Sequence, residues 1–346
     1  MSIVISGLCK AFGGQAAVDG VSIDLAAGEF LVVLGPSGCG KSTLLRLIAG
    51  LDRPDTGEIH IDGQCIAGPG IQMPPEDRAV GVVFQSYALW PHMSVRDNVA
   101  FPAEARGLSR AKARSEADNH LATVDLTGFA DRVPAALSGG QRQRTALARC
   151  LAGGARTILM DEPLANLDPH LRARMEAEIA GFHRETGVTT LYITHDQREA
   201  MALADRIAVM DRGRFLQVAP PQEIHDRPVS ESVARFIGRA AVLDAAIDWS
   251  SAALTAQVGP FCAIAEGATQ TGPARIVIRP GDVTLTDPGG ADAPACLRDV
   301  FYRGGTWEAL AEVEGLSEPV PVSAASPLRN GDRPGLYLRS AWVLPG

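Results

Sequence analysis

The first 235 or so residues alternate between apolar runs typical of strands and apolar spacings typical of helices. The strand patterns lie at residues 21–25, 30–34, 58–63, 80–84, 157–160, 189–194 and 206–210. We expect 58–63 to be an edge strand with its turn, and 80–84 to be a buried strand. A helical pattern begins at Ser42 and is stopped by Gly50.

The segment from about residue 86 to residue 152 differs from its surroundings. It is alanine-rich, poor in strand patterns and helical in spacing, which predicts a helical subdomain inserted between strands. Another helix is expected after 157–160, with Asp168 as its N-cap and Pro169 at its first position. Strand–helix alternation of this kind indicates an α/β fold in which helices cover a mostly parallel sheet. We assign residues 1–238 to this domain.

The remainder of the chain has a different pattern of apolar and polar residues. Strand-like runs occur at 274–278, 309–313 and 335–339, Gly and Pro punctuate them, and no long helical period appears. This pattern predicts a separate all-β domain over residues 239–346, built as a small barrel.

Composition narrows the class of protein. A hydrophobic fraction of 46%, a charged fraction of 21% and a net charge of −8 describe a globular protein and argue against a general nucleic-acid binder. The 6 cysteines show neither a C-x-x-C pair nor a metal-ligand spacing, so we expect reduced thiols. No apolar run is long enough to span a membrane, and the start lacks the features of a signal peptide. We therefore expect a cytoplasmic protein that reaches the membrane only through partners.

A phosphate loop follows the apolar run 30–34. Residues 35–42, Gly-Pro-Ser-Gly-Cys-Gly-Lys-Ser, fit G-x-x-x-x-G-K-[ST] between a strand and a helix. The glycines let backbone N–H groups turn toward phosphate oxygens, and the helix adds its positive end. Lys41 would contact the β- and γ-phosphates, and Ser42 would ligate Mg²⁺. The predicted nucleotide contacts are Gly35, Pro36, Ser37, Gly38, Cys39, Gly40, Lys41, Ser42 and Thr43.

Two acidic residues end the apolar strand 157–160. Asp161 suits the Mg²⁺ shell, and Glu162 suits the polarisation of an attacking water. Such a pair is more often a solvated strand end or a helix cap. The phosphate loop upstream favours the catalytic interpretation.

The stretch 137–141, Leu-Ser-Gly-Gly-Gln, is a second candidate for phosphate contact. Ser138, Gly139 and Gly140 would open a helix and present a hydroxyl and backbone N–H groups, with Gln141 beside them. The chain's own phosphate loop has no need of this surface, which points to two copies closing around shared ATP. Alone, Ser-Gly-Gly is more often a flexible turn.

Together these motifs resemble the ATP-binding cassette family from about residue 3 to residue 238, with every motif in order. The resemblance implies that Ser138 to Gln141 clamp ATP bound to the other subunit, and that Gln85 serves catalysis and the metal. It also implies that His195 senses the γ-phosphate and that Phe12 stacks on adenine. An aspartate loop at 165–168 starts with Ala where Ser is common, and its Asp168 would cap a helix and cross the dimer interface.

The resemblance further implies partners. The expected assembly is a head-to-tail dimer on integral-membrane permease subunits, with an extracytoplasmic solute-binding protein acting indirectly and no nucleic acid. In this family the loop after Gln85 and the helical insert receive a coupling helix, so an exposed Tyr87 or Trp90 would be a docking anchor. Packing of these aromatic residues against their own helices is the commoner alternative.

Two classes of cassette protein compete. One is an importer ATPase, and the other is a soluble cassette ATPase acting on ribosomes or nucleic acid. A single cassette, no heptad run, no metal cysteines and an acidic balance favour the importer. The implied fold is a P-loop NTPase, a RecA-like core with antiparallel β and helical subdomains, followed by a small TOBE-like β domain. Residues 278–283, 74–78 and 86–92 are similar to the polyamine and ferric-iron branch, but the cargo stays open, as does a regulatory or dimer-widening role for the tail.

Overall fold

The computed structural model describes residues 1–165, 167–250, 253–287 and 293–345. They form two compact units, Met1–Pro221 and Gln222–Gly346. The units divide after Pro221, which is earlier in the chain than the expected boundary at residue 238. The reason is that two short helices, α7 (Pro221–Asp226) from its second residue and α8 (Glu231–Phe236), group with the second unit. There Ala234 of α8 packs against Val242 and Val277.

A six-stranded sheet forms the centre of the first unit. Its order is β11-β10-β3-β9-β8-β7, and every neighbouring pair is parallel except β10–β11, which confirms the mostly parallel sheet. The strands are β3 (Phe30–Leu34), β7 (Val80–Val83), β8 (Thr157–Asp161), β9 (Thr189–Thr194), β10 (Arg206–Asp211) and β11 (Arg214–Ala219). All five residues of β3 are buried, as expected when helices cover both faces. β7 was expected to be a buried strand. It lies at the sheet edge and buries only alternate residues, so one of its faces is buried and the other is half-buried.

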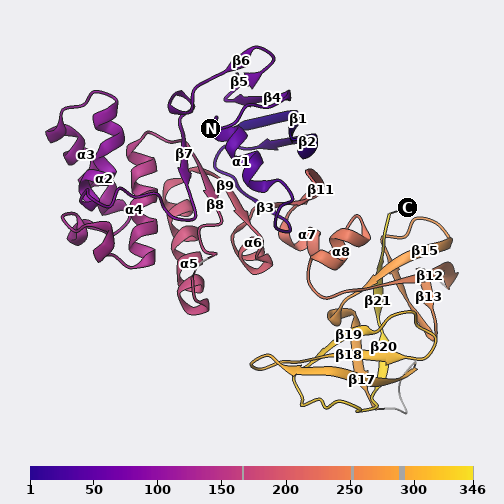
Figure 1. The fold of residues 1–346 in the computed structure, drawn as a ribbon. Coiled ribbons are helices and arrows are strands. Elements are labelled where there is room, and N and C mark those ends of the chain that lie inside the picture. Colours follow the sequence, from indigo (N-terminus) through magenta and orange to yellow (C-terminus); the bar gives the residue numbers. More distant parts are fainter. Residues whose placement is uncertain (166, 251–252, 288–292, 346) are drawn as a thin grey trace. The chain divides into compact units, whose positions relative to one another are not determined.

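Helices flank this sheet. The helices of the first unit include α1 (Lys41–Ala49), α2 (Val95–Ala105), α3 (Arg110–Thr123), α4 (Gly139–Ala152), α5 (Pro169–Thr186) and α6 (Gln197–Leu203). Helices α2, α3 and α4 pack on one another beside β7 and confirm the predicted helical insert (Figure 1). Helix α1 packs instead against β2, β7 and β8, and Gly50 ends it in a left-handed conformation.

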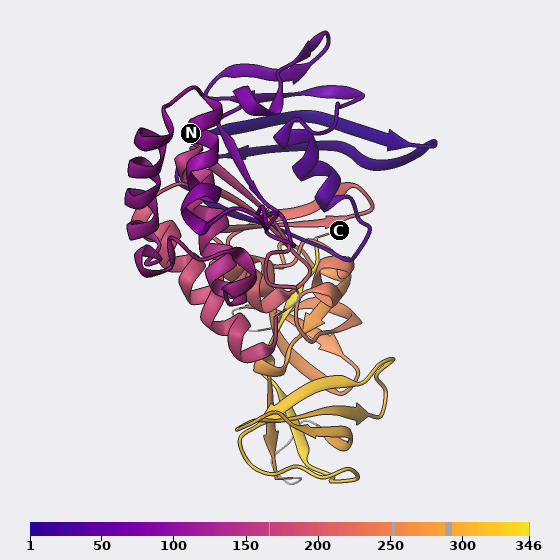
Figure 2. The same ribbon diagram turned by 60° about the vertical axis from the view of Figure 1, so that its left-hand side comes forward.

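An antiparallel sheet lies over α1. Its order is β2-β1-β4-β5-β6, and its long β1–β2 pair is conspicuous in Figure 2. The strands are β1 (Ile3–Phe12), β2 (Gln15–Leu25), β4 (Thr56–Ile61), β5 (Gln64–Gly68) and β6 (Ile71–Gln72). The expectation that 58–63 forms an edge strand is wrong, because β1 and β5 cover both sides of β4. Its inward residues Ile59 and Ile61 join one core with Leu44 and Leu47 of α1.

The second unit contains the predicted barrel and a further sheet. A closed barrel has the order β12-β13-β14-β21-β15, and a five-stranded sheet has the order β16-β20-β17-β18-β19. The strands are β12 (Ala241–Ser250), β13 (Ala253–Val258), β14 (Phe261–Glu266), β15 (Gly272–Ile278), β16 (Val283–Thr286), β17 (Ala293–Tyr302), β18 (Trp307–Val313), β19 (Val320–Ala324), β20 (Gly335–Leu338) and β21 (Ser340–Val343). One apolar core joins the two sheets, since Phe261 of the barrel and Leu297 of the second sheet belong to the same buried cluster.

All six cysteines are free thiols in the structure. None of the helices in the described part of the chain combines the length and the apolarity needed to cross a membrane.

Candidate nucleotide site

The phosphate loop joins β3 to α1 and depends on two glycines at close approaches. A Cβ at residue 35 would lie 2.2 Å from the carbonyl oxygen of Met210, and one at residue 40 would lie 1.9 Å from that of Ala17. Gly40 also has a φ of 110°, which disfavours any other residue. No side chain caps the start of α1. The N–H groups of its first turn are therefore available to an anion.

Lys41 is buried at the start of α1, with 4% of its surface exposed. Its Nζ atom donates hydrogen bonds to the carbonyl oxygens of Gly35, at 2.8 Å, and Pro36, at 3.0 Å. The ammonium group is thus held inside the loop that would surround the phosphates. Burial raises the pKa of the neighbouring Cys39 thiol, so this cysteine is a neutral packing residue of the loop.

Ser42 and Asp161 meet although 119 residues separate them. The Ser42 hydroxyl donates to Oδ1 of Asp161 at 3.0 Å. Burial raises the pKa of Asp161, the charge of Glu162 adds to that rise, and the Ser42 hydrogen bond opposes it. A nearby cation would stabilise the ionised form of this carboxylate. Together with the hydroxyl, the carboxylate makes a donor set suited to Mg²⁺.

Glu162 and His195 face each other at the ends of adjacent strands. His195 Nδ1 lies 3.1 Å from Glu162 Oε2, and the side chains are 51% and 24% exposed respectively. Glu162 has a φ of 45°, a left-handed conformation that is uncommon outside glycine. Its backbone N–H donates to the carbonyl of Ile193 on β9, which fixes the turn. Strained backbone of this kind is typical of functional sites.

Gln85 is exposed in the loop after β7, and the next residues are strained. Tyr87 and Ala88 have φ values of 62° and 46°. Arg149 of α4 donates to the carbonyl oxygens of both, at 3.0 Å and 2.6 Å respectively, and so holds the loop. Sequence reasoning missed Arg149, because only the long-range contact reveals its role.

The two aromatic residues of this loop have different surroundings. Tyr87 is 8% exposed, and its hydroxyl donates to the carbonyl of Pro163. The expectation that Tyr87 could be an exposed docking anchor is therefore wrong. Trp90 is half-buried, with its ring 4.3 Å from that of Phe101 and 5.1 Å from the Arg149 guanidinium. Trp90 keeps an accessible face.

The stretch 137–141 opens α4 as predicted. Ser138 is the N-cap: its Oγ accepts from the N–H of Gln141, and its own N–H donates to the Gln141 side chain at 2.9 Å. This capping box fixes the start of the helix. Ser138 is exposed, whereas a Cβ at Gly140 would lie 2.4 Å from Met175 Sδ. Ser-Gly-Gly is consequently an ordered helix start rather than a flexible turn.

Two further candidates occupy separate elements. Asp168 caps α5, since its Oδ1 accepts from the N–H groups of His170 and Leu171, and Pro169 follows at the first helical position. Asn166 of the aspartate loop lies outside the described residues. Phe12 ends β1 and is 53% exposed, which leaves a ring face free for a planar ligand.

The structure brings the phosphate loop, Ser42, Asp161, Glu162 and His195 to the carboxyl ends of neighbouring strands β3, β8 and β9. Ligands of open α/β sheets bind at this edge. The Ser138 to Gln141 start of α4 belongs to the helical subdomain. The fold and site thus define a P-loop nucleotide-binding protein with an acidic pair beside the loop.

Comparison with known proteins narrows this class. The profile of the ABC transporter family matches residues 18–165. The chain is 39% identical to an sn-glycerol-3-phosphate import ATP-binding protein of Paracoccus denitrificans, over 96% of this chain and 93% of the relative. It is 43% identical to a spermidine/putrescine import ATP-binding protein of Pseudomonas aeruginosa, over 88% of this chain and 84% of the relative.

Among solved structures, a dimeric ATP-binding cassette in a post-hydrolysis state, bound to ADP and phosphate, aligns with a TM-score of 0.55 and 30% identity. The alignment covers 63% of this chain and 98% of the cassette. The chain belongs to the ATP-binding cassette transporter family and carries the ATPase domain of its import ATP-binding subunits.

Proposed function

We propose that this ATPase works as a head-to-tail pair that closes around two shared ATP molecules and drives solute import through membrane subunits. The observation that carries the proposal is the ordered, exposed Ser138 at the start of α4. It offers a hydroxyl and helix N–H groups to an anion, on a different subdomain from the phosphate loop.

Within one copy, the residues of the loop bind the triphosphate. Lys41 exchanges its two carbonyl partners for phosphate oxygens, and the free N–H groups of α1 complete the cradle. Phe12 stacks on adenine. Mg²⁺ would be held by Ser42 and Asp161, with Gln85 as a further ligand, and would supply charge neutralisation at the phosphates.

Glu162 and His195 then support hydrolysis. Glu162 accepts a proton from the attacking water, and its carboxylate is oriented by His195. His195 is more exposed than its partner, which leaves it able to reach the γ-phosphate. Gln85 responds to the occupied site from its position in the loop after β7.

Across the pair, Ser138, Gly139, Gly140 and Gln141 of one copy clamp the γ-phosphate held by the other. Asp168 adds a contact at the same interface while capping α5. The dimeric state of the cassette structure described above supports this arrangement. The all-β unit, in this proposal, widens the contact between the copies.

A groove beside Trp90 would receive a helix of the permease. This cavity of about 570 Å³ lies between β7 and helices α2 and α4, and Trp90, Phe101, Arg106 and Arg149 contribute to its lining. The lining combines these apolar rings with charges of both signs, since Glu76 and Asp77 contribute to it as well, and its apolar part suits the apolar face of an amphipathic helix. Arg149 links the groove to the loop of Gln85, since it binds the carbonyls of Tyr87 and Ala88.

Copurification with the permease tests this docking surface. Trp90→Ala should reduce assembly with the membrane subunits, while Phe129→Ala, on the η2 turn (Thr127–Phe129) of the same subdomain, should not. Unchanged assembly of Trp90→Ala would remove the groove from the proposal. Assembly of this kind would place the chain at the cytoplasmic face of the membrane.

We expect the cargo to be an imported solute, and we leave open which solute it is. The expectation of polyamine or ferric iron rests on the similarity of a few short segments. The two relatives described above are named for different solutes, although their sequence identities to this chain are comparable. We propose to reconstitute the chain with its permease and binding protein and to measure which solute stimulates ATP hydrolysis. Stimulation by ribosomes or DNA instead would favour the soluble-ATPase alternative.

A further inference from the structure

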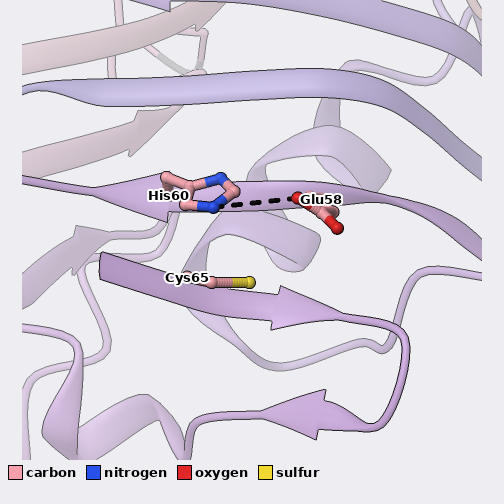
Figure 3. Close-up of side chains that lie close together, drawn as sticks. All are labelled: Glu58, His60 and Cys65. Carbon is pink, nitrogen blue, oxygen red and sulfur yellow. Dashed lines mark ion pairs between the residues drawn. The ribbon is translucent and has the colours of Figure 1, made fainter. Parts of the chain in front are cut away.

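A cluster of three metal-ligating side chains lies on the antiparallel sheet, outside the nucleotide site. Glu58 and His60 come from β4, and Cys65 comes from β5. Their ligand atoms all lie within 4.8 Å of one another. His60 Nε2 is 3.7 Å from Glu58 Oε2, and Figure 3 shows these two groups facing each other with the Cys65 sulfur across from them.

A β-bulge places the thiol on this face. Glu58 and His60 are two residues apart, so they share the outward side of β4, while Ile59 and Ile61 are buried. On β5 the register skips a residue: Ala67 pairs with Ile59, but Cys65 pairs with His60. A regular strand would put Cys65 on the buried side with Ala67. The extra residue turns it outward, as bulges do where a side chain must be re-aimed.

The neighbouring glycine leaves room at the cluster. A Cβ at Gly68 would lie 3.2 Å from Glu58 Cγ and 3.4 Å from Cys65 Sγ. The absence of that atom lets both side chains turn toward a common point. Glu58 is exposed and Cys65 is half-buried, so an ion from solution can reach the cluster.

The chemistry of the three groups selects a kind of ion. A thiolate and a carboxylate together carry two negative charges, which a divalent cation balances, and an imidazole adds a neutral ligand. In a tetrahedral zinc site neighbouring ligand atoms lie about 3.5 Å apart, so the His60–Glu58 pair is already close to the required separation. The Cys65 sulfur lies within 4.8 Å of both ligand atoms and has to turn from the Ala67 carbonyl oxygen, which it contacts at 3.5 Å. Three protein ligands leave one position for water.

We propose that Glu58, His60 and Cys65 bind one Zn²⁺-class divalent ion that clamps β4 to β5. The sequence did not reveal this site, because a Glu-x-His pair followed by a cysteine across a turn matches none of the usual metal spacings. Only the bulge brings the thiol to the other two ligands.

The test uses the purified full chain, freed of metal and kept reduced. Co²⁺ added to it should give one equivalent of binding with a thiolate charge-transfer absorption band. Cys65→Ser should abolish that band, and Cys65→Ser or His60→Ala should each weaken Zn²⁺ binding by more than about a hundredfold in competition with a chromophoric chelator. Glu58→Gln should weaken it by at least about tenfold.

Matched controls separate this site from scattered surface ligands. Cys262→Ser removes an exposed thiol away from the cluster, and His92→Ala removes an exposed imidazole away from it; neither should change the Zn²⁺ affinity. In the wild-type chain, Zn²⁺ should also slow alkylation of Cys65 but not of Cys262, a readout that needs no variant. The proposal is overturned if Cys65→Ser keeps the wild-type Zn²⁺ affinity, if no thiolate band appears, or if alkylation of Cys65 is unaffected by Zn²⁺.

Discussion

His195 Nδ1 lies 3.1 Å from Oε2 of Glu162, joining residues that are 33 positions apart in the chain. The contact exists because β8 and β9 are parallel neighbours that pair Asp161 with Ile193 and end together. It orients the carboxylate of Glu162, while the left-handed backbone of that residue sets the direction in which its side chain leaves the chain. The pairing of β8 with β9 therefore sets the positions of both side chains.

Glu162→Gln should lower ATP turnover by about a hundred- to ten-thousand-fold while ATP binding persists, because the amide cannot accept a proton from water. His195→Ala should lower turnover as well, through loss of the orienting contact. Steady-state phosphate release and nucleotide binding measure the two effects separately. Glu185→Gln, an exposed position on α5, serves as the control. Rapid hydrolysis by Glu162→Gln would remove Glu162 from the role of base.

Lys41→Ala should weaken ATP binding by at least about tenfold, since charge-assisted hydrogen bonds to phosphate are lost. Lys112→Ala, which removes an exposed lysine of α3, should leave the affinity unchanged. Titration with a fluorescent ATP analogue gives both affinities. Equal affinities for the two variants would contradict the placement of the phosphates beside Lys41.

Gly40→Ala should destabilise the first unit by more than about 2 kcal/mol, because the new Cβ meets the Ala17 carbonyl in a backbone conformation that L-residues avoid. Gly128→Ala is the matched control: its Cβ would meet no atom within 4 Å, and its change should stay within about 0.5 kcal/mol. Urea unfolding followed by circular dichroism compares the two. Similar stabilities would argue against the close approach of the loop to Ala17.

Stability should fall in mild acid partly through His183. Burial lowers the pKa of this imidazole below its ordinary 6.5, and its ring packs edge-on against Phe30. A depressed folded pKa means that the stability is complete above about pH 6.5 and is lost as the pH falls toward the folded value. His183→Gln should flatten this dependence when the free energy of unfolding is measured at several pH values. An unchanged slope would assign the pH dependence to other groups.

Sequence patterns predicted the local backbone shapes of the candidate site because neighbouring residues set these shapes. The phosphate loop, the Ser138 cap and the Asp168 cap each consist of neighbouring residues whose types impose a backbone shape. Contacts across the chain were not predictable in this way. The Arg149 clamp on the strained loop, the burial of Tyr87 and the central position of β4 all depend on packing between distant segments.

The proposed function requires that two copies of the chain share ATP. Its most direct test is the sedimentation of Glu162→Gln with and without MgATP, compared with the double variant Ser138→Arg/Glu162→Gln. We expect an ATP-dependent dimer for the first, and a monomer that still binds ATP for the second, because the arginine blocks the exposed start of α4. An equally stable ATP-dependent dimer of the double variant would show that the start of α4 does not hold the partner's ATP.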